Sequence, residues 1–267
     1  MLDTSLIELW PIVIAGGFVV GFLVGMTGVG AGSLMTPFLI SQVGLSPSLA
    51  VGTDLLFAGL TKATAAARHH SLNNVDWPIV RWLALGSVPG AIAMLLLLGY
   101  LKPDVEAISR FIKGSLAVTL VFSSLAIALY PLLARGKLQI NGDHAETPVR
   151  PLPTFLLGLT IGAMVTLTSV GAGAIGVVVL SALYPRLITR RLVGTDIVHA
   201  IPLTLISGAG HASMGNVNLL LLAMLLAGSI PGIALGARLT GRLPDWMLRT
   251  ALAIVLMIAA YQLYQKI

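Results

Sequence analysis

The sequence predicts an all-α integral membrane protein. Of its 267 residues, 57% are hydrophobic and only 10% are charged, and the mean hydropathy is +0.96. A chain with so few polar side chains cannot cover the surface of a soluble globule. Its apolar segments are close to the roughly 20 residues that cross about 30 Å of hydrocarbon, and they lack the alternation of membrane barrel strands. We therefore expect a bundle of membrane helices.

The second half of the sequence repeats the first. Thr27-Gly-Val-Gly-Ala-Gly32 returns as Thr168-Ser-Val-Gly-Ala-Gly173, and Val51-Gly-Thr-Asp54 returns as Val193-Gly-Thr-Asp196. Further repeated motifs occur at nearly the same separation, 142 positions against 141 for the glycine stretch, which a chance match between glycine-rich stretches would not produce. A duplicated unit of this length predicts two pseudosymmetric halves of one membrane domain.

Hydropathy divides each half into five helical segments. In the first half we expect them at about 6–26, 31–43, 48–68, 77–100 and 108–133, and in the second at about 153–167, 172–184, 191–211, 217–239 and 245–264. The predicted organisation is a first repeat at 1–134, a polar cytoplasmic linker at 135–152 and a second repeat at 153–267.

An odd number of segments per half predicts that the two halves lie upside down relative to each other. Loop charges agree: the loop before the third segment is uncharged in the first half, whereas its counterpart carries Arg186, Arg190 and Arg191. The N-terminus carries acidic residues and no Lys or Arg before the first segment, so we expect both termini outside. The second segment of each half is too short to cross unaided, and the sequence leaves open whether it crosses or is re-entrant.

Composition also excludes several functions. The net charge of +6 and a pI near 10.0 fit the basic cytoplasmic loops of a membrane protein, and no basic run is interleaved with aromatic residues as in nucleic-acid binders. With no cysteine, the chain has no disulfide, thiolate nucleophile or cysteine metal site. The glycine stretches lack the strand–helix context of dinucleotide binding and the lysine of a P-loop. We predict no cofactor and no metal.

The two glycine stretches are the predicted anion site. They contain too much glycine for a continuous membrane helix, and unwound backbone at membrane depth requires surrounding protein or a water-filled cavity. Exposed amides and the N-terminus of the following half-helix would then bind an anion. The alternative is that the glycines serve close packing alone. The predicted substrate-binding residues are Thr27, Gly28, Gly30, Gly32, Ser33, Thr53, Lys62, Thr168, Ser169, Gly171, Gly173 and Thr195.

The third and eighth segments carry most of the polar residues within apolar sequence. Asp54, Lys62 and His69 share one helical face of the third segment, and Asp196 and His211 share the matching face of the eighth. Ionised groups are costly near the bilayer centre, so these faces should line an aqueous cavity or meet a partner. Two alternatives stay open: the aspartates could be structural, and Lys62 could extend to the cytoplasmic surface.

Proton or ion coupling is predicted for the titratable groups on these two segments. They are Asp54, Asp196, His199, His69 and His211. His199 lies one turn from Asp196 and has Phe57 as its counterpart. A structural, hydrogen-bonded histidine is the alternative for His199.

These residues resemble the TauE/SafE-type sulfite exporter family of bacterial membrane proteins. The resemblance is carried by the glycine motif followed by Pro37, the paired Val-Gly-Thr-Asp motifs, Lys62 in Thr-Lys-Ala, and His199-Ala-Ile-Pro202. It implies a multi-pass carrier in the bacterial inner membrane for small sulfur-containing anions such as sulfite or organosulfonates, driven by an ion gradient.

The expected function is therefore secondary transport, with export as the expected direction, and not enzymatic catalysis. Its partners are a small anion and the lipid bilayer, with a homo-oligomer left open. Two alternatives remain: an anion channel, and an intramembrane hydrolase that pairs Ser33 or Ser169 with a histidine.

Overall fold

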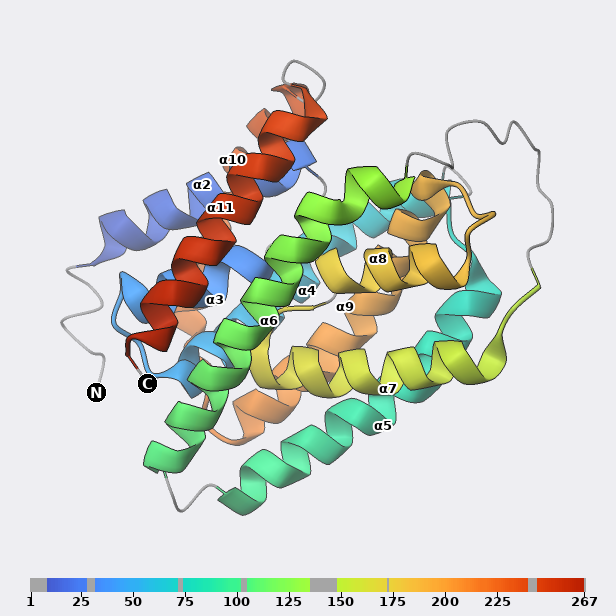
Figure 1. The fold of residues 1–267 in the computed structure, drawn as a ribbon. Coiled ribbons are helices and arrows are strands. Elements are labelled where there is room, and N and C mark those ends of the chain that lie inside the picture. The colour runs from blue at the N-terminus through green and yellow to red at the C-terminus, as the bar shows by residue number, and fades with distance from the viewer. Residues whose placement is uncertain are drawn as a thin grey trace.

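The computed structural model describes residues 9–27, 32–71, 74–101, 105–134, 148–171, 173–239 and 244–266. Within these ranges all regular secondary structure is helical, which confirms the predicted class, and six of the described helices are long and apolar enough to span a membrane. The helices, shown in Figure 1, are α2 (Trp10–Thr27), α3 (Gly32–Ser41), α4 (Pro47–Ser71), α5 (Trp77–Leu101), α6 (Val105–Ala134), α7 (Pro151–Thr168), α8 (Ala174–Leu183), α9 (Thr189–Ser213), α10 (Leu219–Leu239) and α11 (Asp245–Tyr264).

These helices follow the expected segments closely because apolar runs and proline positions are local properties of the sequence. α7 begins at Pro151, slightly before the expected start at 153, since proline is favoured in the first turn of a helix. The expected linker falls mostly on 135–147, which lies outside the described residues.

Helices α2 and α10 come from different halves and pack together through glycines. A Cβ added at Gly17 would lie 2.6 Å from the Leu225 carbonyl oxygen, and one at Gly21 would lie 2.5 Å from that of Ser229. Only glycine allows so close an approach between helix backbones. The paired residue numbers rise together, so the two helices run parallel. The glycines on α2 therefore serve close packing of the two helix backbones.

Helices α5 and α7 are joined in the same way. A Cβ at Gly86 would overlap the Phe155 carbonyl oxygen, and one at Gly90 would overlap that of Leu159. These helices also run parallel. Each half therefore contributes one helix to each of the two glycine-packed pairs.

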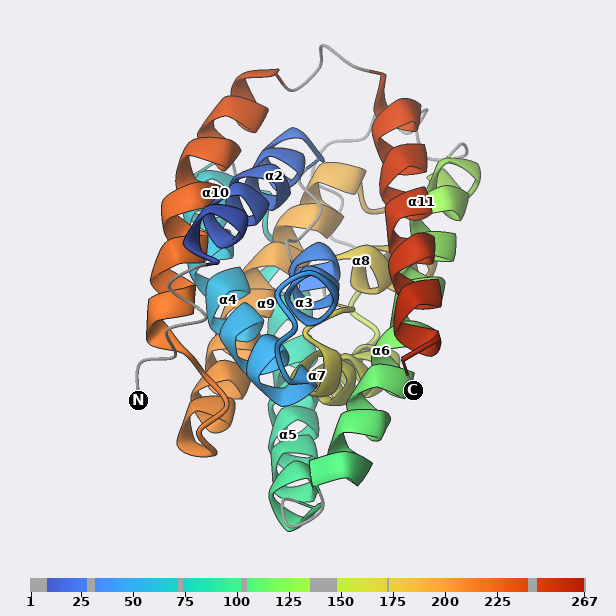
Figure 2. The same ribbon diagram turned by 90° about the vertical axis from the view of Figure 1, so that its left-hand side faces the viewer.

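Helices α4 and α9 lie in the middle of the bundle, between these two pairs, with α6 and α11 packed together on one side (Figures 1 and 2). Gly52 on α4 packs against His211 on α9, whereas Gly59 packs against Leu205. The paired numbers change in opposite directions, so α4 and α9 are antiparallel. α4 also contributes side chains to both of the apolar clusters that form the core, Phe57 to one and Leu55 to the other.

Helices α7 and α8 form a re-entrant hairpin. The hydroxyl of Tyr184, directly after α8, accepts a hydrogen bond of 3.1 Å from the backbone N–H of Arg150, directly before α7. The same hydroxyl lies 2.5 Å from that of Thr154. The end of α8 therefore returns to the side of the bundle on which α7 begins. This answers the question that the sequence leaves open for the second half.

Helices α2 and α3 return in the same manner. α3 leads directly into α4, and Thr53 near the start of α4 accepts a 3.1 Å hydrogen bond from the backbone N–H of Asn218, directly before α10. Because α2 and α10 run parallel, α2 begins on that side too. Since α4 and α9 are antiparallel, the two hairpins enter the bundle from opposite ends. The interpretation as two inverted repeats remains a prediction, which this arrangement favours.

Thiol labelling tests the inverted orientation. The chain has no cysteine, so Ser71→Cys at the end of α4 and Ser213→Cys at the end of α9 would each introduce a single thiol. We expect a membrane-impermeant maleimide added to intact cells to label position 213 and spare position 71, because the sequence predicts the arginine-rich end to be cytoplasmic. Permeabilised cells provide the control for reactivity at position 71. Equal labelling of both positions in intact cells would contradict the orientation.

Candidate functional site

The polar faces of α4 and α9 are buried in the centre of the bundle. On α4, Asp54 is fully buried and Lys62 is 8% exposed. On α9, Asp196, Ser207 and His211 are at most 1% exposed. The predicted faces therefore point inward in both helices. The side chain of His69, predicted to continue the face on α4, lies outside the described residues.

Lys62 is the positive charge of this centre. Its ammonium group interacts electrostatically with the carboxylates of Asp196 and Asp54, and the interaction with Asp196 is the stronger. A lysine that extends to the membrane surface keeps its amine in water. The amine of Lys62 is instead buried in protein, where it interacts with two carboxylates. The position of Lys62 thus favours the interior role, while binding of an anion to it remains a prediction.

Asp54 is held by a residue that the sequence analysis did not single out. The backbone N–H and the hydroxyl of Thr36 on α3 both donate to Asp54 Oδ2, at 3.1 Å and 2.5 Å. Asp54 Oδ1 is buried without a hydrogen-bond partner. The sequence could have drawn attention to Thr36 as a hydroxyl residue one turn beyond a glycine motif. Nothing in the sequence indicates that Thr36 contacts Asp54.

The second glycine motif breaks the helix as predicted. Ser169 has a φ of 58°, in the left-handed region, and Gly171 and Gly173 have φ values of 126° and 117°. α7 ends before this stretch and α8 begins after it. The Ser169 hydroxyl approaches the Asp54 carboxylate without a hydrogen bond of normal geometry, and its oxygen is buried without a partner. The break therefore lies beside the charged centre.

The neighbouring Thr168 hydroxyl is engaged locally. It donates to the carbonyl oxygens of Met164 and Val170, at 2.7 Å and 3.1 Å, and so stabilises the end of α7. In the first motif, α2 ends at Thr27, α3 begins at Gly32 and Ser33 is buried. Gly28 and Gly30 lie outside the described residues, as does the Thr27 side chain. The role of this motif in binding remains a prediction.

Thr53 and Thr195 hold the starts of two helices from the opposite half. Thr195 accepts a 2.9 Å hydrogen bond from the backbone N–H of Asp76, before α5, as Thr53 does from Asn218 before α10. Asp76 and Asn218 in turn accept hydrogen bonds through their side chains from the first turns of α5 and α10. These contacts give both threonines a structural role, and substrate binding by either remains a prediction.

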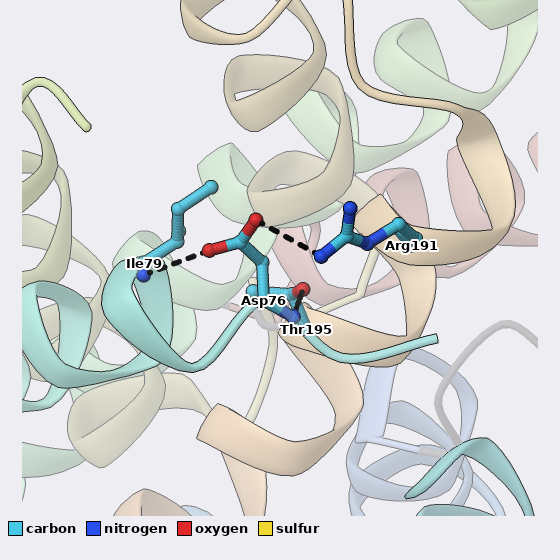
Figure 3. A network of polar contacts seen from close by, with 4 residues as sticks. All are labelled: Asp76, Ile79, Arg191 and Thr195. Atoms are coloured by element: carbon cyan, nitrogen blue, oxygen red, sulfur yellow. Dashed lines mark hydrogen bonds and ion pairs between the residues drawn. The ribbon is translucent and has the colours of Figure 1, made fainter. Parts of the chain in front are cut away.

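An ion pair adds to this arrangement on one side only. Arg191 on α9 lies 3.4 Å from Asp76 Oδ2, next to the Thr195 contact, as Figure 3 shows. The corresponding position on the other side holds Asn218, which is uncharged. The start of α5 is thus tied to the start of α9 more strongly than α10 is tied to α4.

Two buried histidines complete the polar centre. His199 Nε2 lies 2.8 Å from the hydroxyl of Ser87 on α5. His211 Nε2 lies 3.0 Å from the carbonyl oxygen of Thr166, so this nitrogen carries a proton and donates. The Nδ1 atoms of both rings are buried without a partner. Both histidines are therefore hydrogen-bonded within the bundle. This agrees with the alternative that His199 is a structural histidine, and a part of either residue in ion coupling remains a prediction.

This geometry suits the binding of a small anion better than catalysis. The Ser169 oxygen is buried without a hydrogen-bond partner, and His199 is hydrogen-bonded to Ser87 instead. What the centre brings together is a buried ammonium, a hydroxyl and a helix break, with carboxylates alongside. Such groups can hold oxyanion oxygens and exchange an ion with them.

Comparison with known proteins identifies the family. Residues 13–263 match the family described as Sulfite exporter TauE/SafE. The chain is 34% identical over 256 residues to the "Probable membrane transporter protein YjnA" of Bacillus subtilis (strain 168), covering 94% of this chain and 98% of the relative. It is 26% identical over 271 residues to a "Probable membrane transporter protein" of Haemophilus influenzae, covering 94% and 96%.

No solved structure matches the chain. Both relatives are named as probable membrane transporters, and the match covers nearly their whole length. This chain is therefore a multi-pass membrane transporter, and the hydrolase alternative is set aside. The chain belongs to the TauE/SafE sulfite exporter family.

Proposed function

We propose that the protein carries small sulfur-containing anions, such as sulfite or organosulfonates, across the bacterial inner membrane, driven by an ion gradient. The observation that carries this proposal is the burial of Lys62 in the bundle centre, where it interacts electrostatically with Asp54, the carboxylate that the Ser169 hydroxyl at the helix break approaches. The family description names sulfite export, and the charge and donors at the centre suit an oxyanion.

Each part of the centre has a role in this proposal. Lys62 supplies positive charge, while the backbone amides at Gly171 and Gly173 and the Ser169 hydroxyl donate to the oxygens of a sulfite or sulfonate group. The break leaves Ser169 Oγ without a partner, and a buried hydroxyl of this kind gains most from a ligand. The N-terminus of α8 adds a favourable dipole.

The arrangement of the hairpins supports alternating access. They enter from opposite ends, and the helix pairs α2–α10 and α5–α7 each join one half of the chain to the other. Rocking of one glycine-packed pair, with the helices attached to it, against the other pair would open the centre first to one side and then to the other. The Asp76–Arg191 ion pair joins α9 to the residue directly before α5 at one end of the bundle.

A liposome assay tests the function. Purified protein is reconstituted and uptake of sulfite, isethionate (2-hydroxyethanesulfonate), sulfate and chloride is compared under imposed ion gradients. We expect saturable uptake and anion exchange for sulfite and isethionate. Uptake that rises linearly with concentration would favour the channel alternative, and absence of sulfite and isethionate transport would contradict the proposal.

Gly171→Ala tests the break as a binding element. The φ of 126° at Gly171 is strained for any residue with a side chain, although the space for a Cβ is ordinary, with Val165 Cγ2 at 3.6 Å. The change should therefore alter the backbone locally, at a cost of about 1–3 kcal/mol, without displacing a neighbour. We expect folded protein that binds sulfite at least about tenfold more weakly, as calorimetric titration would measure.

Gly44→Ala is the matched control for this variant. Gly44 also has a positive φ, 76°, with nothing within 4 Å of an added Cβ, but it lies in the α3–α4 turn away from the centre. We expect wild-type affinity in this control. Wild-type affinity in Gly171→Ala would instead leave the motif with a packing role alone. Gly30→Ala is the corresponding change in the first motif, and we expect the same loss of affinity.

A further inference from the structure

Binding of an anion makes the net charge of the bundle centre more negative. Lys62 contributes one positive charge, and Asp54 and Asp196 together contribute two negative charges when ionised. A monovalent anion would add a further negative charge to a buried site, where like charges repel strongly because the local dielectric constant is low. One proton taken up with each anion would keep the net charge of the site unchanged.

The two carboxylates have different surroundings. Asp196 is the stronger electrostatic partner of Lys62, and it packs against Gly176 on α8. Asp54 interacts less with Lys62, and its carboxylate lies beside Ser169 at the helix break. An anion held at that break would place its charge next to Asp54. Asp54 is therefore the carboxylate that lies beside the Ser169 hydroxyl, which is proposed to bind the anion.

Thr36 adds to the difference between the two. Its N–H and hydroxyl both donate to Asp54 Oδ2. The Oδ1 atom is buried without a hydrogen-bond partner in Asp196 and in Asp54 alike, so the contact at Oδ2 is what distinguishes them. A proton on Asp54 Oδ1 would turn this orphan acceptor into a donor, which could then bond to the Ser169 oxygen or to the anion. The glycine motifs lie 141 positions apart and the Val-Gly-Thr-Asp motifs 142, so Thr36 corresponds to Val177 or Val178 in the second half, and neither has a hydroxyl to offer Asp196.

Other titratable groups near Asp54 have different partners. The helices packed against α4 are α3, α6, α7, α9 and α10. α9 presents Asp196, His199 and His211, and both histidines are hydrogen-bonded, to Ser87 and to the Thr166 carbonyl. α3 and α7 contain no charged residue, and the charged residues described on α6 and α10 are at least partly exposed.

We propose that the protein carries one proton with each monovalent anion, that Asp54 holds this proton, and that Asp196 stays ionised as the counter-ion of Lys62. This inference rests on the proposed function and adds the coupling ion. The proton arrives with the anion from the side to which the centre is open, and both leave together on the other side. Net direction then depends on the anion gradient and the pH gradient together.

Isethionate is the probe for this coupling. Its sulfonate group is ionised at every working pH, so it carries no proton of its own. Liposomes that hold the wild-type protein and a trapped pH-sensitive dye receive labelled isethionate in sodium-free buffer, with the membrane potential clamped. With the outside about one pH unit more acidic, one proton per anion allows up to about tenfold accumulation. We expect this accumulation and a matching acidification of the interior.

Asp54→Asn identifies the carrier of the proton. The amide has nearly the shape of a protonated carboxyl group, so this variant should still exchange internal for external isethionate but should lose the pH-driven accumulation. Asp196→Asn removes the counter-ion of Lys62, and we expect weaker binding with proton entry still matched to any remaining uptake. Glu106→Gln, a change at a side chain that is 82% exposed, is the matched control and should behave as wild type.

Each result decides the matter. Exchange of isethionate by the wild type without proton entry would overturn the inference and leave the proposed function standing. Accumulation that persists in Asp54→Asn would overturn the assignment to Asp54. Absence of isethionate exchange in the wild type would overturn the proposed function, and the inference with it. Loss of isethionate exchange in Asp54→Asn would also overturn the assignment to Asp54, because an amide with the shape of the protonated carboxyl group should still allow exchange.

Discussion

Lys62→Met is expected to abolish anion binding. Methionine keeps much of the length of lysine but removes the buried charge that interacts electrostatically with Asp196 and Asp54. Lys62→Arg keeps the charge and should retain part of the binding, with altered selectivity among anions, because the planar guanidinium presents its donors differently. Calorimetric titration of purified protein with sulfite should give a loss of at least about 100-fold for methionine, or roughly 2.7 kcal/mol.

A double variant separates binding from stability. Lys62→Met leaves the buried carboxylates of Asp196 and Asp54 without the ammonium that interacts with them. An uncompensated buried charge costs about 3–5 kcal/mol, so this variant should also lower the melting temperature. Lys62→Met combined with Asp196→Asn restores the net charge of the centre. We expect the double variant to recover most of the stability and none of the anion binding. Wild-type affinity in either variant would remove Lys62 from the site.

Gly86→Ala is expected to lower the stability of the helix packing strongly, although it adds only one methyl group. The added Cβ would overlap the Phe155 carbonyl oxygen, which belongs to helix backbone and cannot move aside as a side chain can. α5 and α7 would have to separate along a contact that joins the two halves of the chain. Overpacking of this kind costs about 3 kcal/mol, which corresponds to a fall of roughly 6–12 °C in the melting temperature.

Gly99→Ala on the same helix is the matched control. Gly99 has nothing within 4 Å of an added Cβ, so alanine should leave the melting temperature unchanged or raise it slightly through its better helix propensity. Melting curves in one detergent compare the two variants directly. Equal melting temperatures for both variants would show that the α5–α7 contact is more adaptable than its geometry indicates.

The sequence alone determined which segments form helices and where they break. Hydropathy, proline positions and the duplicated glycine stretches are local signals, and α4 and α9 begin and end 142 positions apart, at the spacing of the sequence echoes. The polar faces of these two helices also followed from helical periodicity, because Asp54 and Lys62 lie two turns apart on one helix. The resemblance to the TauE/SafE family added the expected substrate class.

Only the tertiary structure decided which of these elements meet. Periodicity identifies a face that must be covered and does not name its partner, so the α2–α10 and α5–α7 pairs across the halves could not be read from the sequence. The re-entrant course of α8 depends on Tyr184 returning to Arg150 and Thr154. Thr36 escaped notice for the same reason, since its contact with Asp54 depends on the packing of α3 against α4.

The two Val-Gly-Thr-Asp motifs show most clearly what residue type and spacing could not predict. Their duplication indicated that Thr53 and Thr195 matter, and it suggested substrate binding. In the structure each threonine holds the start of a helix from the other half, over sequence separations of 165 and 119 residues. A hydroxyl group serves a ligand and a backbone N–H equally well, so residue type and spacing do not distinguish the two. The choice between them is made by which polar group the folded chain brings within hydrogen-bond distance.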